Sequence, residues 1–272
     1  MVEVKMVWGK GGMSMLWRGR MLAFSLALAV LCGLCRLAEG QDAGGKPPGR
    51  GFVRLFDGKT LAGWHVSGKT PHGTGGRWEV VDGAIVGRQD PPGQGGILIT
   101  DKQFEDFDLV LEAKPDWGVD SGIFLRSTEE GRCYQVMVDY HAGGNLGGIY
   151  GEGLPGGLHH RTYSLNENGE VVPTPELSGR ERLRFRPEDW PKVWRKDDWN
   201  QFRIRIQGNP PAITVWINGR LVTQFQDRVK RLADRGGIAL QVHGGGDTSA
   251  LAVRYRNIWV RPLTPASPVP NF

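Results

Sequence analysis

Polar side chains of several chemical types recur on one side of the short alternating runs in this sequence. With a period of two, residues 133–139 place Tyr134, Val136 and Val138 on one side and Gln135 and Asp139 on the other. Three other runs divide in the same way, and their polar sides carry Glu112, Arg126, Gln241 and His243. If these four strands share one sheet, they form a surface that combines an acid, a base and a cation.

The same pattern also fits an ordinary solvated face, which antiparallel sheets commonly have. Solvated faces favour Lys, Glu and Thr, whereas these runs present Gln, Asp, Arg and His beside Gly-rich turns. This composition favours a functional surface, and the solvated face remains the alternative.

The elements that must position these side chains read as strands. Asp82-Gly83 and Asn218-Gly219 each separate two apolar runs, which is typical of two-residue hairpins. Alternating runs also occur at 52–56, 107–113, 122–127, 133–140, 202–207, 237–243 and 252–260. With almost no helix signal between them, they predict an all-β fold, an antiparallel two-sheet jelly-roll sandwich.

One segment departs from this pattern. Residues 173–198 contain seven Lys or Arg between 180 and 196, together with Trp190 and Trp194. They fit a solvated insertion loop, or alternatively a flap whose tryptophans stack on a ligand.

Several motifs match functional patterns in letters but lack the structural context. Residues 63–70 (GWHVSGKT) fit a phosphate loop, but the following PHGTGG cannot begin the helix that such a loop requires. Residues 151–156 (GEGLPG) fit GxGxxG with a proline inside and no helix after it. The chain has no GxSxG nucleophile motif and no HExxH zinc motif. Nucleotide binding and serine nucleophile chemistry are therefore disfavoured.

The first forty residues have the layout of a secretory signal peptide. Basic residues precede an apolar run at 21–34, which is too short to span a bilayer, and Ala38-Glu39-Gly40 fits a cleavage site. We therefore expect export to the periplasm or the extracellular space, with no stable membrane span. Residues 41–50 read as a linker, 51–262 as the sandwich and 263–272 as a Pro-rich tail.

Charge and cysteine content change once this segment is set aside. The chain carries +5, and residues 1–40 hold five basic and two acidic residues (+3), so about +2 remains. We therefore expect no nucleic-acid partner. Of three cysteines only Cys133 remains, so it has no partner for an internal disulfide and reads as a packed cysteine.

An ordered set of motifs resembles a known family. Residues 52–64 (FVRLFDGKTLAGW) look like the opening signature of the 3-keto-disaccharide hydrolase domain family. WEVVDG at 78–83, SGIFLR at 121–126, YQVMVD at 134–139, WING at 216–219, GIALQVHG at 237–244 and YRNI at 255–258 follow in that family's order. The resemblance covers about residues 50–261. Asp120 stands where the family often has Asn, and Gln135 where it often has Glu.

The resemblance implies a concanavalin A-like fold and exported enzymes that cleave 3-keto-glycosides. A ketone at sugar C3 acidifies the C2 proton, so a base can start elimination of the C1 substituent, after which water adds back. Such a site needs a base, an acid and a group that stabilises the oxyanion. On this basis His243 and His141 are candidate bases, Arg126 holds the oxyanion, and Gln135 and Gln241 complete the catalytic set.

The same argument makes Glu112 and Asp139 candidate ligands of a divalent cation such as Ca²⁺, Mg²⁺ or Mn²⁺. The expected partner is a carbohydrate substrate. Two other hypotheses remain open: a lectin-like carbohydrate-binding module without turnover, which would show a shallow aromatic groove, and a cell-surface interaction domain, which would show no pocket.

Overall fold

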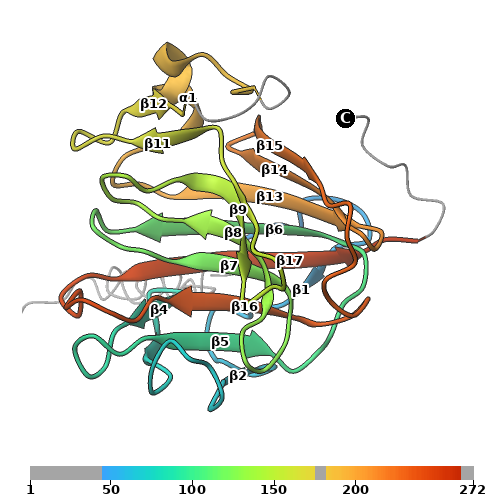
Figure 1. Cartoon of the computed structure of the whole chain (residues 1–272). Helices are drawn as coiled ribbons and strands as arrows, with labels where there is room; N and C mark the ends of the chain where they lie inside the picture. The colour runs from blue at the N-terminus through green and yellow to red at the C-terminus, as the bar shows by residue number, and fades with distance from the viewer. Residues whose placement is uncertain (1–44, 175–181, 265–272) are drawn as a thin grey trace, which may run out of the picture. The chain divides into compact units, whose positions relative to one another are not determined.

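Two antiparallel sheets form the protein in the computed structural model, which describes residues 45–174 and 182–264 (Figure 1). The larger sheet has the order β15-β14-β13-β6-β17-β4-β3, with β1 paired to β17. Its strands are β1 (Val53–Arg54), β3 (Arg77–Val81), β4 (Ala84–Arg88), β6 (Phe107–Pro115), β13 (Asn200–Gln207), β14 (Ala212–Ile217), β15 (Arg220–Gln226) and β17 (Val253–Pro262).

The second sheet has seven strands in the order β10-β9-β8-β7-β16-β5-β2. Its strands are β2 (Trp64–Val66), β5 (Gly96–Thr100), β7 (Gly122–Ser127), β8 (Cys133–Val138), β9 (Leu146–Glu152), β10 (His159–His160) and β16 (Gly237–Val242). A small hairpin pairs β11 (Tyr163–Leu165) with β12 (Val171–Pro173). The predicted all-β, antiparallel sandwich is therefore confirmed.

Both hairpin predictions hold in detail. Asp82 and Gly83 join β3 to β4 with φ values of 50° and 75°, and Asn218 and Gly219 join β14 to β15 with 49° and 76°. Positive φ at both turn positions defines the turn that matches strand twist, and Asn, Asp and Gly adopt it at low cost.

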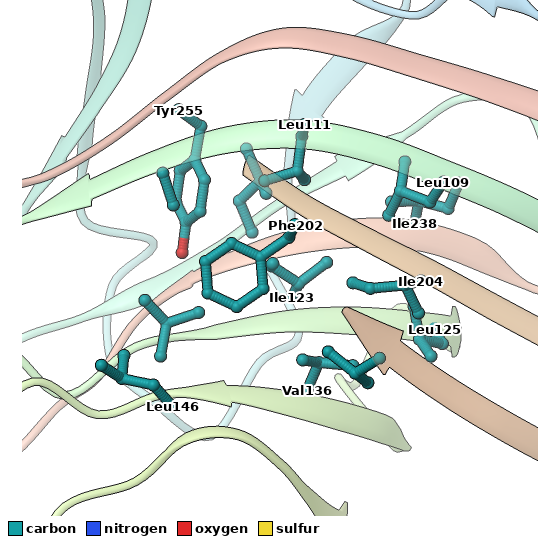
Figure 2. Packing of buried hydrophobic residues seen from close by; sticks show 14 of the residues in the cluster. Leu109, Leu111, Ile123, Leu125, Val136, Leu146, Phe202, Ile204, Ile238 and Tyr255 are labelled. Atoms are coloured by element: carbon teal, nitrogen blue, oxygen red, sulfur yellow. The ribbon is translucent and has the colours of Figure 1, made fainter. Parts of the chain in front are cut away.

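The core lies between the two sheets and follows the predicted alternation. Figure 2 shows inward-facing residues of both sheets in contact, among them Leu109, Leu111, Ile123, Leu125, Val136, Phe202, Ile204 and Ile238. Each is fully buried. Because every second residue of each strand is committed to this core, the alternate residues must face outward.

The outer face of the seven-stranded sheet divides into two regions. One carries a small apolar cluster of Ile97, Ile99, Phe124, Cys133 and Ala239. Cys133 is fully buried there, which confirms its reading as a packed cysteine, and burial raises the pKa of its thiol well above the usual value. The other region is polar and forms the site described below.

The described part of the segment 173–198 is a largely exposed insertion, as one interpretation predicted, but its two tryptophans are buried. Its described part contains a 3₁₀ turn, η1 (Pro187–Asp189), and a short helix, α1 (Trp190–Val193). Trp190 and Trp194 stack with an interplanar angle of 11° and belong to the core cluster. The ligand-stacking flap is therefore wrong, because burying two large indoles in the core is more favourable than leaving them at the surface.

Among the described residues, none of the helices has the length and apolar content that a bilayer crossing requires. The predicted signal peptide, residues 1–40, lies outside the described residues, and so does most of the Pro-rich tail.

Candidate active site

A cavity of about 390 Å³ opens on the polar region of the seven-stranded sheet. Strands β8, β9 and β10 and the loops beside them supply its walls. Its ionisable lining residues are His72, Asp120, Asp139, His141, Glu152, His159, Arg161 and His243. Four imidazoles, three carboxyl groups and one guanidinium therefore lie around one cavity.

Four of the candidate site residues line this cavity: Gln135, Asp139, His141 and His243. Gln241 belongs to the same cluster, because the Gln135 amide donates to Gln241 Oε1 at 3.2 Å. Gly122 allows this arrangement, since a Cβ there would lie 2.3 Å from the Gln135 amide nitrogen. Strand parity had placed Gln135, Asp139, Gln241 and His243 on one face, and His141 was predicted from its place just after the strand end; their catalytic roles stay predictions.

Glu112 does not belong to this site. It lies on β6, in the eight-stranded sheet, where its carboxylate accepts hydrogen bonds from Arg256 (2.6 Å) and Asn257 (3.0 Å). Its predicted position on the non-core side is correct, but β6 pairs with β13 and β17 rather than with β8. Glu112 and Asp139 therefore lie on different sheets and cannot hold one metal ion together.

Arg126 also departs from the predicted surface. It has φ of 53°, and the β7–β16 register shifts beside it, so a β-bulge turns its side chain away from the outer face. The guanidinium donates to the carbonyl oxygens of Glu105 (2.7 Å) and Gly208 (2.9 Å) and to the Asp106 carboxylate (2.7 Å). Arg126 therefore ties β7 to the ends of β6 and β13 and is not available to a ligand.

His72 is a site residue that strand parity could not find, because it lies in the loop between β2 and β3. The Gln241 amide approaches its Nε2 at 3.2 Å, so this nitrogen accepts a hydrogen bond. Burial, and then the nearby His243, lower the pKa of His72 to about 4. The hydrogen bonds from Gln135 to Gln241 and from Gln241 to His72 thus hold a neutral imidazole at the cavity. The ring centroids of His72 and His243 are 5.5 Å apart.

The loop that carries His243 is held by close contact with the His72 loop. The Gln89 amide donates to the carbonyl oxygens of His243 (3.0 Å) and Gly245 (3.3 Å). A Cβ at Gly244 would lie 2.0 Å from the His72 carbonyl oxygen, so only glycine permits this approach. His243 itself is exposed at the mouth of the cavity, where an incoming ligand can contact its ring.

Two carboxyl groups and an imidazole, those of Asp120, Asp139 and His141, interact with one another in the lining of the cavity. Burial and the neighbouring Asp120 raise the pKa of Asp139 well above its usual value, and in the described part of the chain the buried Asp139 Oδ1 has no hydrogen-bond partner. Burial opposes ionisation of Asp120 too, but His141 and His243 outweigh it and lower its pKa. The Asp120 carboxylate, 3.9 Å from His141 Nε2, in turn raises the pKa of His141.

Glu152 completes the ionisable set on β9, with its Oε1 3.9 Å from His72 Nε2. Burial raises the pKa of this carboxyl group. Glu152 lies opposite Cys133 and Tyr150 opposite Gln135 in the β8–β9 ladder. Strand parity would have placed Glu152 on this face if residues 146–152 had been recognised as a strand. The three glycines of this segment interrupt the alternation of apolar and polar residues that predicts a strand.

The divalent cation was predicted at Glu112 and Asp139. Within residues 45–174 and 182–264, no group of three or more His, Cys, Asp or Glu side chains is arranged to hold a metal ion. With Glu112 on the other sheet, the predicted pair of ligands does not fit such an ion.

The buried, neutral His72 gives an expected pH dependence of stability. Its folded-state pKa of about 4 lies below the ordinary 6.5, so between these values the unfolded chain binds a proton that the folded chain does not. Stability is therefore lost as pH falls from 6.5 towards 4, by up to about 1.4 kcal/mol per pH unit. Urea unfolding of wild type and His72→Gln over this range measures the difference.

His65→Gln is the matched control for this measurement. In the wild type, the hydrogen bond to Asp101 raises the pKa of His65. The stability that His65 contributes is therefore present at low pH and is lost as pH rises through the raised pKa. The two variants should therefore change the pH profile in opposite directions. Parallel profiles for wild type and His72→Gln would contradict the neutral, buried state of His72.

The protein is an antiparallel β-sandwich with a cavity of acidic and basic side chains on one outer sheet face. This cavity of about 390 Å³ is named the acid–base cavity. Comparison with known proteins then assigns the family. Residues 51–261 match the family model of the 3-keto-alpha-glucoside-1,2-lyase-like domain, and the chain belongs to this family.

Individual relatives are more distant. A 3-keto-disaccharide hydrolase of Bacteroides thetaiotaomicron is 37% identical over 84 residues, which cover 29% of this chain and 28% of that protein. A crystal structure of a candidate glycosyl hydrolase from Parabacteroides distasonis is 17% identical, with a TM-score of 0.50, and covers 79% of this chain and 94% of that chain. The carbohydrate-binding module CBM66 from Bacillus subtilis is 13% identical, with a TM-score of 0.44, and covers 73% and 95% of the two chains.

Proposed function

We propose that this protein cleaves 3-keto-glycosides by abstraction of the C2 proton, elimination of the C1 substituent and hydration. The observation that carries the proposal is that one cavity is lined by imidazole and carboxyl groups whose pKa values are shifted in opposite directions. His72 has a lowered pKa, while the pKa values of His141, Asp139 and Glu152 are raised. Groups whose environments push their pKa values apart can serve as bases and acids at the same pH. Family membership supports the choice of substrate class.

The first step needs a base beside C2 of the bound sugar. We assign it to His243, which stands at the cavity mouth next to the neutral His72. His243 takes the C2 proton, and the electron pair forms an enediolate with the C3 ketone. Arg126 cannot stabilise this oxyanion, because its guanidinium is bound to Asp106 and two carbonyl oxygens; Arg161, which lines the cavity, is the guanidinium that can.

The second step needs an acid at the leaving oxygen. The enediolate electrons form the C1=C2 double bond as the C1–O bond breaks, and the leaving oxygen takes a proton. His141 fits this role because the Asp120 carboxylate keeps it protonated to higher pH. Water then adds across the double bond, with its hydroxyl at C1 and a proton at C2. Overall one water is consumed, and the proton balance closes.

A direct test compares a 3-keto-glucoside with its parent glucoside, each with and without chelator. We expect cleavage of the keto compound alone, because only a C3 ketone acidifies the C2 proton. Cleavage of both compounds at similar rates would contradict elimination, and an unchanged rate in chelator would exclude a required metal ion. Product analysis by mass spectrometry after incubation with the purified protein gives the result.

A carbohydrate-binding module without turnover is the second candidate. Tyr150 favours it, because the residue is 40% exposed, lines the cavity and packs its ring edge-on against His159, as a sugar-stacking side chain would. The same incubation separates the two candidates: a binding module would retain both sugars and release no product. An interaction domain without a pocket receives no support, given the cavity of about 390 Å³.

A further inference from the structure

A second cavity of about 320 Å³ lies outside the site already described. It is bounded by β15, at the edge of the eight-stranded sheet, by residues 160 and 162 beside β10, and by the segment after the β11–β12 hairpin. Small-molecule sites typically occupy roughly 300–1,000 Å³, so this cavity has room for a ligand about the size of a monosaccharide.

Three arginines line this second cavity: Arg182, Arg184 and Arg228. It is therefore named the arginine cavity. Among residues 45–174 and 182–264, no ion pair joins any of these three guanidinium groups to a carboxylate. Thr162, Thr223 and Gln226 add polar groups to the same wall. The cavity thus gathers three positive charges and several hydrogen-bond donors.

Packing holds two of these arginines toward the cavity. Residues 182–185 alternate, and Leu183 and Phe185 pack against the core while Arg182 and Arg184 line the cavity. The Phe185 ring stacks on Trp190 with 5.7 Å between centroids. The guanidinium groups are therefore carried by an anchored segment, which reduces the entropy cost of ordering them around a ligand.

The segment at β10 separates this cavity from the acid–base site. His159 and Arg161 line the acid–base cavity, whereas His160 and Thr162 line the arginine cavity. Successive residues of an extended chain point to opposite sides, so one strand forms the wall between two chemically different pockets.

We propose that the arginine cavity, defined by Arg182, Arg184 and Arg228, binds the oxyanion of a small ligand, a carboxylate or sulfate. Guanidinium groups match these planar or tetrahedral oxyanions with paired hydrogen bonds, and the threonine hydroxyls supply further donors. The proposal does not depend on turnover at the first site, because binding is measured without catalysis.

Calorimetric titration of the full chain at low ionic strength tests the proposal, with glucuronate, glucose and inorganic sulfate as probes. We expect binding of glucuronate or sulfate and none of glucose by this cavity. Arg184→Gln and Arg228→Gln should each weaken oxyanion binding about tenfold. Raising the ionic strength should weaken binding as well, because salt screens exposed charges.

Arg220→Gln is the matched control, since Arg220 is exposed on β15 but does not line the cavity. Its affinity for the oxyanion should equal that of wild type. Glucuronate binding tighter than sulfate would identify an acidic sugar as the source of the oxyanion, and equal affinities would identify the free anion as sufficient. No oxyanion binding, or equal losses in Arg220→Gln and Arg184→Gln, would overturn the proposal.

Discussion

His243→Ala is expected to lower turnover of a 3-keto-glycoside by ~10²–10⁴-fold, the usual contribution of a positioned general base. Substrate affinity should change little, because the cavity retains its other lining side chains. Steady-state kinetics that separate kcat from KM provide the measurement. His65→Ala is the control: His65 is an imidazole outside the cavity, paired with Asp101 and Glu129, and its removal should leave turnover intact.

The same reaction run in D₂O adds an independent readout. Hydration returns a solvent proton to C2, so the product should carry deuterium there. Cleavage without deuterium at C2 would exclude elimination, whichever residue is the base. A normal rate in His243→Ala with deuterium still at C2 would instead assign the base to His72, to His141 or to a carboxylate.

Arg126→Met is expected to cost roughly 3 kcal/mol in the free energy of unfolding, since a buried guanidinium that makes three hydrogen bonds is removed. The Arg126 side chain is 1% exposed, and its loss takes a donor from two carbonyl oxygens and leaves the Asp106 carboxylate with the Gly208 N–H. Urea unfolding measures the change. Turnover per folded molecule should be unchanged, because the guanidinium lies away from the acid–base cavity.

Arg132→Met is the matched substitution at the surface. The Arg132 side chain is 58% exposed, and its ion pair with Glu130 spans 4.0 Å, so its removal should cost less than about 1 kcal/mol. Equal stability of the two variants would contradict the structural role of Arg126. A specific loss of turnover in folded Arg126→Met would return Arg126 to the catalytic set.

Strand parity predicted much of the site because it reports a local property. Side chains at positions 135, 139, 241 and 243 had to lie opposite a buried face once their neighbours entered the core. Both hairpins were equally local, because Asp-Gly and Asn-Gly accept the positive φ of the turn.

The errors have a common physical origin in long-range pairing. Glu112 was placed on the correct side of its strand, but nothing in residues 107–115 specifies which sheet that strand joins. Arg126 sits at a bulge, where one extra residue reverses the expected side, and the bulge depends on the partner strand β16. His72 entered the site through a loop, for which no periodicity exists.

The sequence by itself therefore determined most of the long strands, two hairpin turns, the division of those strands into core and outer sides, and the family signature. Tertiary structure alone decided which strands are neighbours, which loops close over the polar face, and how burial tunes each ionisable group. The reason is that side-chain alternation is set within a few residues, whereas the acid–base character of His72, Asp120 and Asp139 arises from burial and from charges distant in the chain.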